Sequence, residues 1–445
     1  MAQYTVQWDQ NGIGKRVNVT TGAVAWIARL DGGRGGQSTH ETKADAKAWL
    51  SRQTTKRRTG KRPTKEDRTQ TFAQYIAWWL DQKASGAVRD RNNAQRKIGR
   101  RTLHDYRALM GDWITDARRL PKGSSGRIGH VRVGRLTFHD LNALYDAMHE
   151  VTTVGTVRAL HRLLGQVFVD AVAKGVLDLN PCDIANVPAA DEKKKRPGMT
   201  VAQAQTFLRM ARENADTQGA DVPMHQVPER CWSARWFVAI WSGLRPGEVR
   251  ALRWDDVEGL DSAAPVLHVR EALEYVPGKD DEAKAPKTEA GVRDVPLALD
   301  VARELKQWKR VQAMQRLHAG PEWEDDRTRG GLVFTMPTGA HLTLAAQRRA
   351  FERVSAKAEL GTWTEAEPIR EHKTGPVRKR AFKPSFRVYD CRHTCVTLLR
   401  SHGVPDHVVA AWIGHGDEQT LPTYSHVHAE DLQRALATLG KALTA

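Results

Sequence analysis

The sequence has little cysteine and no long apolar run. Its 445 residues include 4 Cys, at positions 182, 231, 391 and 395, which are too few and too scattered for a disulfide scaffold and fit a reducing cytosol. No stretch approaches the ~18 apolar residues of a membrane helix. The opening residues, MAQYTVQWDQ, show no basic segment leading into an apolar one, so no secretory signal is expected. We therefore expect a cytoplasmic protein without a membrane partner.

Positive charge is what the chain has in excess. There are 69 Lys+Arg against 52 Asp+Glu, a formal charge of +17, and the sequence pI is about 9.8. Such an excess favours a polyanionic partner, and nucleic acid is favoured over a membrane surface because no lipidation motif or basic amphipathic helix is visible. The alternative is a soluble enzyme that merely happens to be basic. Hydrophobic residues make up 40%, enough for real cores.

The first part of the chain reads as a small module, residues 1–52. Segments 4–8, 16–20 and 23–30 are rich in Val, Thr and aromatics and are separated by Gly or Asn turns, which predicts a three-stranded antiparallel sheet. A helix is expected to begin at Thr42.

A basic linker is predicted at residues 53–68. Residues 52–68 hold eight Lys and Arg in seventeen positions, opposed by Glu66 and Asp67 alone. Runs of this kind are often solvated tethers, but between two modules of a basic protein the run also fits tracking of a DNA backbone. The candidate DNA contacts here are Arg57, Arg58, Lys61 and Arg62.

Residues 69–187 have a helical pattern throughout. Apolar and aromatic residues recur at helical spacing near positions 72–79, 103–113, 141–148 and 154–174, which predicts four helices with the aromatic stripes in their core. Basic residues lie between the stripes, and these are the candidate DNA contacts Arg96, Lys97, Arg100 and Arg101. A second polar linker is expected at residues 188–198.

From residue 199 to 445 the pattern is mixed. Strands are expected at 266–272 and 292–297 around a polar loop, and residues 361–381 read as an irregular charged loop. The final segment, residues 429–443, is an amphipathic helix. It could pack on its own core or dock on a neighbouring copy of the chain.

Five polar residues stand out in this last part, each weak by itself. Arg245 lies in SGLRPGEVRALRWDD, Lys287 in APKTEAGVRDVPL and Arg392 in YDCRHT. His415 ends IGH, and Tyr424 follows nine residues later in TYSHVH.

The nearby cysteines do not make a metal site. Cys391, Cys395 and His393 are too few ligands at too tight a spacing for zinc, so no metal is expected.

Taken together and in order, these motifs resemble the tyrosine recombinases, also called phage-type integrases. GLRPGE, a hairpin lysine, RHT, IGH and a tyrosine nine residues on agree in order, separation and flanking words. The resemblance implies a multidomain fold, mainly α with small β-sheets. It comprises a sheet-plus-helix module like the family's arm-binding domain, a helical core-binding domain, and a mixed α+β catalytic domain at 199–445.

The resemblance also assigns roles to the motif residues. Arg245 and Arg392 match the two arginines that clamp the scissile phosphate, and Tyr424 matches the nucleophile. Lys287 matches the hairpin lysine, taken as general acid, and His415 matches the histidine that supports the phosphate or exchanges protons. The supporting residues would be Glu248 and His393.

One position departs from the family pattern. The residue three before the second arginine is most often His or Lys, and here it is Tyr389. A phenol can donate a hydrogen bond to phosphate but carries no positive charge, so an altered role is expected. That Tyr389 is itself the nucleophile is a weaker alternative.

The function implied is site-specific DNA recombination that integrates, and also excises, a phage or mobile element in a bacterial host cell. Tyr424 would form a 3′-phosphotyrosyl link, so no metal or nucleotide cofactor is expected. The implied partners are double-stranded DNA at core and arm attachment sites, a homotetramer on two DNA sites, an excisionase and a DNA-bending host protein. The alternatives are a type IB topoisomerase-like enzyme that relaxes DNA and a non-catalytic DNA-binding regulator.

Overall fold

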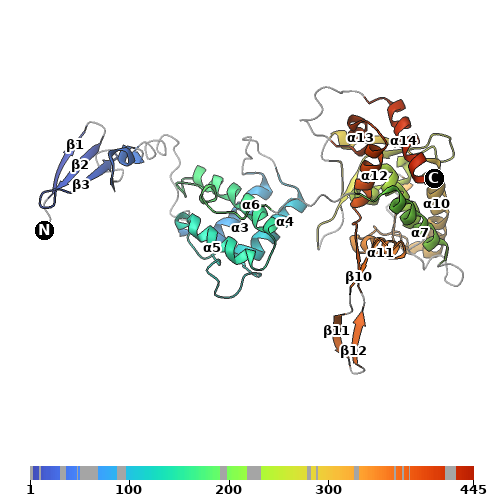
Figure 1. Ribbon diagram of the computed structural model, residues 1–445, viewed down its shortest axis with the longest axis horizontal. Helices are drawn as coiled ribbons and strands as arrows, with labels where there is room; N and C mark the ends of the chain where they lie inside the picture. Colours follow the sequence, from blue (N-terminus) through green and yellow to red (C-terminus); the bar gives the residue numbers. More distant parts are fainter. Residues whose placement is uncertain are drawn as a thin grey trace. The chain divides into compact units, whose positions relative to one another are not determined.

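The computed structural model of the chain divides into two compact units, Met1–Lys193 and Lys194–Ala445, here called the N-terminal and C-terminal units (Figure 1). The division falls inside residues 188–198, the expected linker, and the finer domain division stays a prediction. The residues that the structure describes are 4–9, 12–30, 37–47, 49–50, 69–87, 97–190, 198–217, 232–277, 282–286, 289–324, 330–364, 367–372, 375–379, 381–415 and 427–444.

The N-terminal unit begins with a four-stranded antiparallel sheet. Its strands follow one another in space as in sequence, and they are β1 (Tyr4–Trp8), β2 (Ile13–Asn18), β3 (Val24–Arg29) and β4 (Gln37–His40). One face is covered by the helical residues 43–47, where Ala46 packs with Ile13 and Ala28. The prediction of three strands was wrong, because β4 is the short polar sequence QSTH, which becomes a strand only by pairing with β3.

A helical domain completes the N-terminal unit. Its helices are α3 (Phe72–Ser85), α4 (Arg100–Met110), α5 (Phe138–His149) and α6 (Val154–Ala173), with short η2 (Gly111–Thr115), η3 (Val133–Arg135) and η4 (Pro181–Asp183) between or after them. The four expected helices are confirmed. Thr71 and Thr137 cap α3 and α5 with reciprocal hydrogen bonds to the third helical residue, which fixes where each helix begins. The aromatic stripes lie in the core, where Phe72 stacks on Phe168 with ring centroids 5.3 Å apart.

The helices of the C-terminal unit surround one large core. They are α7 (Val201–Thr217), α8 (Trp232–Ser242), α9 (Pro246–Ala251), α10 (Leu299–Ala319), α11 (Leu344–Lys357), α12 (Asp390–Ser401), α13 (Asp406–Ile413) and α14 (Ala429–Thr444), with the short turns η7 (Trp254–Asp256), η8 (Glu289–Gly291) and η9 (Gly320–Glu322). α8 is buried from Ser233 to Ser242, and Trp236 and Trp241 belong to the same core as Trp308 and Trp412. None of the helices among the described residues combines the length and apolarity needed to cross a membrane.

Small sheets lie around that core. They are built from β5 (Val257–Glu258), β6 (Val266–Val269) and β9 (Arg293–Pro296); from β7 (Ala272–Glu274) and β8 (Glu282–Lys284); from β10 (Gly361–Trp363) and β13 (Phe382–Pro384); and from β11 (Glu367–His372) and β12 (Gly375–Lys379). β6 and β9 confirm strands within 266–272 and 292–297.

Two details of these sheets differ from expectation. The first expected strand ends at Val269 and a separate strand, β7, begins at Ala272. Residues 361–381 are not an irregular loop, because β10 pairs with β13 and β11 pairs with β12 as antiparallel strands. Figure 1 shows β11 and β12 continuing outward from β10.

The last helix, α14, packs on its own unit. Its residues Ala435, Leu439 and Leu443 belong to the buried core, and Gln205 Nε2 on α7 donates a hydrogen bond to the Ala442 carbonyl at 2.9 Å. Of the two placements open for this amphipathic helix, the chain by itself adopts the one on its own core, against α7, α12, α13 and β9.

Candidate active site

Arg245 lies immediately before α9, and the local sequence explains its position. Pro246 suits the first turn of a helix because it has no N–H to satisfy there. The Arg245 backbone N–H donates to Glu248 Oε2 at 2.9 Å, and its Nη1 donates to Glu248 Oε1 at 2.7 Å. The carboxylate therefore closes the start of the helix and orients the guanidinium at the same time.

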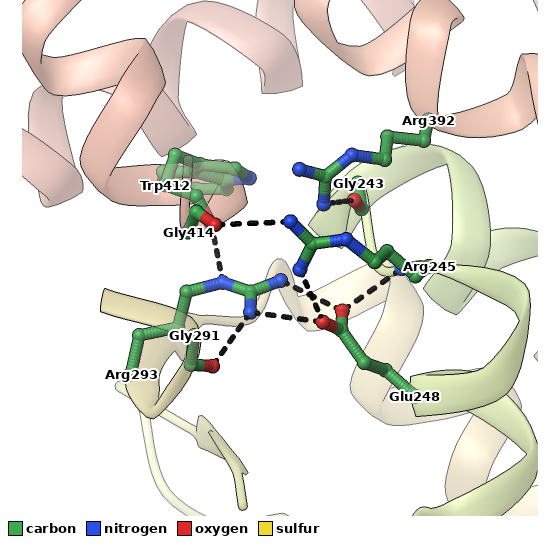
Figure 2. Close-up of polar contacts among 8 residues, drawn as sticks. All are labelled: Gly243, Arg245, Glu248, Gly291, Arg293, Arg392, Trp412 and Gly414. Atoms are coloured by element: carbon green, nitrogen blue, oxygen red, sulfur yellow. Dashed lines mark hydrogen bonds and ion pairs between the residues drawn. The ribbon is translucent and has the colours of Figure 1, made fainter. Parts of the chain in front are cut away.

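Glu248 binds two arginines, Arg245 and Arg293, which are distant from each other in sequence. Arg293 on β9 donates from Nη2 to Glu248 Oε2 at 3.0 Å, and both side chains are almost fully buried, at 6% and 1% exposed. Burial raises the pKa of the Glu248 carboxyl, but the charges and hydrogen bonds of Arg293 and Arg245 outweigh it and bring that pKa below its usual range. Figure 2 shows this carboxylate joined to both guanidiniums by hydrogen bonds.

Arg392 brings a third guanidinium to the same place. It lies near the start of α12, is 4% exposed, and donates from Nη1 to the Gly243 carbonyl at 2.9 Å. Burial, together with the charge of Arg245, lowers the pKa of Arg392 to about 10, so the group is still charged at neutral pH. Three guanidiniums against one carboxylate leave a net positive site that favours an anion.

The end of α13 forms one wall of this site. Arg245 Nη2 donates to the Gly414 carbonyl at 3.1 Å, and Arg293 Nε donates to the Trp412 carbonyl at 2.9 Å. Gly414 has φ +65°, a conformation that glycine adopts without strain. His415 follows directly and is exposed, and its backbone N–H donates to the Ala410 carbonyl at 3.0 Å.

Two of the sequence-predicted site residues, Lys287 and Tyr424, lie outside the described residues. Lys287 follows β8 by three positions and precedes η8 by two. Tyr424 falls between α13 and α14.

Tyr389 and His393 lie at the surface beside Arg392. Tyr389 is 42% exposed, and its ring is 5.2 Å from that of His393 in an edge-on arrangement. Cys391 and Cys395, in contrast, are fully buried, and burial raises the pKa of each thiol to about 12. These thiols are therefore protonated core groups on the opposite side of the helix from exposed His393.

Of the expected DNA contacts, Arg57, Arg58, Lys61, Arg62 and Arg96 lie outside the described residues. Lys97 and Arg100 are exposed just before and at the start of α4. Arg101 is half-buried, and its Nε donates to Asp105 Oδ2 at 3.0 Å, one turn further along the helix.

Sequence reasoning missed Arg293. It lies six residues after Lys287 in KTEAGVRDVPL, at the start of a strand that continues with one exposed residue and two buried ones. No local feature marks it, since its partners Glu248 and Trp412 are far away along the chain.

We expect Glu248→Gln to lower the free energy of unfolding of the C-terminal unit by about 2–3 kcal/mol at pH 7, because it leaves guanidiniums without a buried counter-charge. The lowered pKa sets the pH window. The carboxylate's stabilisation is present above the ordinary value of 4.5 and is lost as pH falls through the lower folded value. Urea unfolding followed by tryptophan fluorescence measures the difference, which should shrink below that pH. Glu322→Gln, at an exposed glutamate, is the control, and equal stability of the Glu248 variant and wild type at pH 7 would contradict the expectation.

We expect Gly414→Ala to destabilise the unit by about 2–4 kcal/mol, the sum of left-handed strain and overpacking. A Cβ there would lie 2.7 Å from the Ala290 carbonyl and 2.8 Å from Arg293 Nη1. Gly403 is the matched control, because its φ is +80° and a Cβ there meets nothing within 4 Å. Gly403→Ala should cost only about 1 kcal/mol, the strain alone. Thermal melting of the two variants compares them, and equal shifts would show that the contact with Arg293 is unimportant.

Comparison with known proteins places this site in context. Residues 224–431 match the phage integrase family. A tyrosine recombinase XerC-like protein of Caldanaerobacter subterraneus is 25% identical over 64% of this chain and 65% of its own length. An integrase of Streptomyces ambofaciens is 25% identical over 65% of this chain and 64% of its own length. The chain thus spans slightly less than two thirds of each of these two relatives.

Two further matches cover more of the chain. A protein described as the prophage phiRv2 integrase in Mycobacterium tuberculosis is 25% identical over 90% of this chain and 87% of its own length. Among solved structures, the Tn1549 transposon integrase bound to a circular intermediate DNA is similar with a TM-score of 0.56 and 18% identity. It covers 83% of this chain and 100% of the solved one. At that identity the structural match establishes a shared fold.

Proposed function

Because this chain belongs to the tyrosine recombinase family, we propose that it is a site-specific DNA integrase that breaks and rejoins DNA through a 3′-phosphotyrosyl link. The observation that supports this most directly is the cluster of Arg245 and Arg392 around one buried carboxylate, Glu248. Its charge and its forked donors suit a phosphodiester, whose non-bridging oxygens gain negative charge during transesterification.

In the proposed reaction the phenolic oxygen of Tyr424 attacks the scissile phosphorus. The bond from phosphorus to the 5′ oxygen breaks, the 3′ phosphate stays on the tyrosine, and Lys287 gives the leaving oxygen its proton. The tyrosine proton passes to His415 or to water. A 5′ hydroxyl from a second duplex then attacks the phosphotyrosine and restores the enzyme.

The arginines have a second task toward the nucleophile. A phenol has an ordinary pKa near ~10, and nearby cations favour its ionised form. Arg392, charged at neutral pH despite its burial, supplies such a field together with Arg245. Tyr389, exposed beside Arg392, would donate a hydrogen bond to the phosphate and add no charge.

The two alternatives from the sequence are less well supported. The relatives reported above are named as integrases and a tyrosine recombinase. Their names favour a reaction that joins two DNA sites over the relaxation of supercoiled DNA. A regulator without activity would have no need for a buried carboxylate that orients a guanidinium and is itself held by a second one.

We further propose that the N-terminal sheet binds arm-type DNA sites with its open face. Tyr4, Val6 and Trp8 lie on the face opposite the covering helical residues, and all three are exposed. Arg16 lies 3.6 Å over the Tyr4 ring, and Arg29 lies 4.0 Å over the Trp8 ring. Stacking holds the guanidiniums in place at the surface, where they can contact phosphates or base edges.

The double variant Arg16→Ala/Arg29→Ala tests the arm-binding proposal. We expect it to lose nuclease protection of the arm sites and to retain protection of the core site, because the two footprints use different parts of the chain. Loss of two phosphate contacts should also lower the slope of log affinity against log salt by about 2. Lys43→Ala is the control, since that side chain lies near Asp9 and Trp26 on the other face. An unchanged arm footprint in the double variant would overturn the proposal.

Strand exchange on two duplexes needs one tyrosine for each cut strand, so we propose that the working form is a homotetramer on two DNA sites. An excisionase and a DNA-bending host protein are the further partners to be tested by adding them to the reaction in each direction.

Covalent trapping tests the proposed reaction. A nicked duplex carries the core site, which is sought in DNA flanking the gene. After cleavage it loses the short fragment that bears the freed 5′ hydroxyl, and the enzyme stays attached to the 3′ phosphate. We expect a protein–DNA adduct that survives denaturant, with the DNA joined through its 3′ phosphate. Tight, specific binding to that site without any adduct would overturn the enzymatic proposal and favour the regulator.

A further inference from the structure

Arg293 has a buried side chain that makes hydrogen bonds to several parts of the proposed active site. Its Nε donates to the Trp412 carbonyl at 2.9 Å and its Nη1 to the Gly291 carbonyl at 3.0 Å. Its Nη1 and Nη2 also reach the two oxygens of Glu248, at 3.5 and 3.0 Å. Figure 2 shows the side chain extending from β9 between these three partners.

These partners belong to three separate parts of the site. Glu248 orients Arg245 at the start of α9. Trp412 lies in the last turn of α13, two residues before Gly414, whose carbonyl also binds Arg245. Gly291 ends η8, four positions after Lys287. One side chain thus connects the arginine, histidine and lysine segments.

Arg293 is poorly suited to contact the phosphate itself. An arginine has five N–H donors, and the contacts above engage four of them. The side chain is 6% exposed. Arg392, in the described part of the chain, donates one such bond, to Gly243, so most of its donors can turn to a ligand.

Resting on the proposed function, we infer that Arg293 is a positioning residue for DNA cleavage. It fixes Glu248, and through it the guanidinium of Arg245, and it holds the end of α13 and the segment after Lys287 at a constant distance from that guanidinium. Its positive charge also balances the carboxylate, so that Glu248 can hold Arg245 without cancelling the site's attraction for phosphate.

The test separates cleavage from binding in Arg293→Met and Arg293→Lys. Single-turnover cleavage of the nicked core-site duplex is measured at saturating protein, and affinity is measured by mobility shift. We expect the cleavage rate of Arg293→Met to fall about 100-fold while its Kd for DNA changes by less than about threefold. Misplacement of a reacting group lowers the rate of the chemical step and leaves the affinity for DNA nearly unchanged. Arg293→Lys should recover little, since an ammonium cannot span the three partners as a fork does.

A substrate with a neutral group at the cleavage position distinguishes a positioning role from a purely structural one. A structural defect would lower the cleavage rate equally on both substrates. With a methylphosphonate at the cleavage position less negative charge builds up, so the orientation of Arg245 matters less. The loss caused by Arg293→Met should then shrink to less than about tenfold. Arg303→Met serves as control, because that side chain is 70% exposed on α10, and thermal melting checks that the variants fold.

The outcomes distinguish the two claims. A wild-type rate in Arg293→Met, or an equal loss on both substrates, would overturn the positioning role while the reaction itself stands. Absence of any adduct with the wild-type chain would instead overturn the proposed function.

Discussion

Tyr424→Phe is expected to abolish the covalent adduct on nicked core-site DNA while leaving DNA affinity unchanged. The substitution removes one oxygen, the atom that would become bonded to phosphorus, and keeps the ring. The loss is expected because the proposed reaction needs this oxygen in line with the leaving 5′ oxygen. The rate should drop below detection, a loss of at least about 10⁴-fold for removal of a covalent nucleophile. Denaturing gel electrophoresis of the trapped complex measures it.

Tyr389→Phe is the matched control for that experiment. It makes the same chemical change at Tyr389, which lies beside Arg392 and is 42% exposed. We expect it to form adduct at a rate within about tenfold of wild type, the effect of one neutral hydrogen bond to phosphate. If the Tyr424 variant formed adduct and the Tyr389 variant did not, the nucleophile would be Tyr389.

Arg392→Met is expected to lower the cleavage rate by about 10³-fold, equal to about 4 kcal/mol of transition-state stabilisation. In the proposed reaction its charged fork faces a developing negative charge from a buried position, where water screens the interaction poorly. Methionine keeps the length and apolar packing of the side chain. Single-turnover cleavage at saturating protein measures the loss.

Arg400→Met is the comparison variant, since Arg400 lies on the same helix and is 58% exposed, in a surface pair with Asp406. Its cleavage rate should stay within about twofold of wild type, as expected for an exposed ion pair. Similar losses in both variants would show that the effect comes from helix α12 as a whole and not from the guanidinium at the site.

The sequence predicted those parts of the structure whose causes are local. Helices α3, α5 and α6 follow from apolar spacing and end signals within each segment. Arg245 and Glu248 are three residues apart, so their contact is a property of one helix start. The order and spacing of the motifs also predicted that Arg392 lies in the same site as Arg245, and the two guanidiniums do interact.

What could not be predicted depends on distant partners. β4 is four polar residues that form a strand only beside β3. β11 and β12 are rich in charge and proline, and their pairing gives them a regularity that their composition does not predict. Arg293 gains its importance from Glu248, 45 positions earlier, and Trp412, 119 positions later, and no pattern in one sequence reports such a pairing.

The packing of α14 against α12 and α13 has a consequence for the order in which the chain folds. Protein synthesis proceeds from the N-terminus, so Arg245 and Arg392 leave the ribosome before α14, the helix that packs on α12 and α13. Until residues 435–443 have been added, α12 and α13 lack part of the apolar surface that holds them. The arginine-bearing segments can therefore fold early, but α12 and α13 gain their full apolar packing only after residues 435–443 have been made.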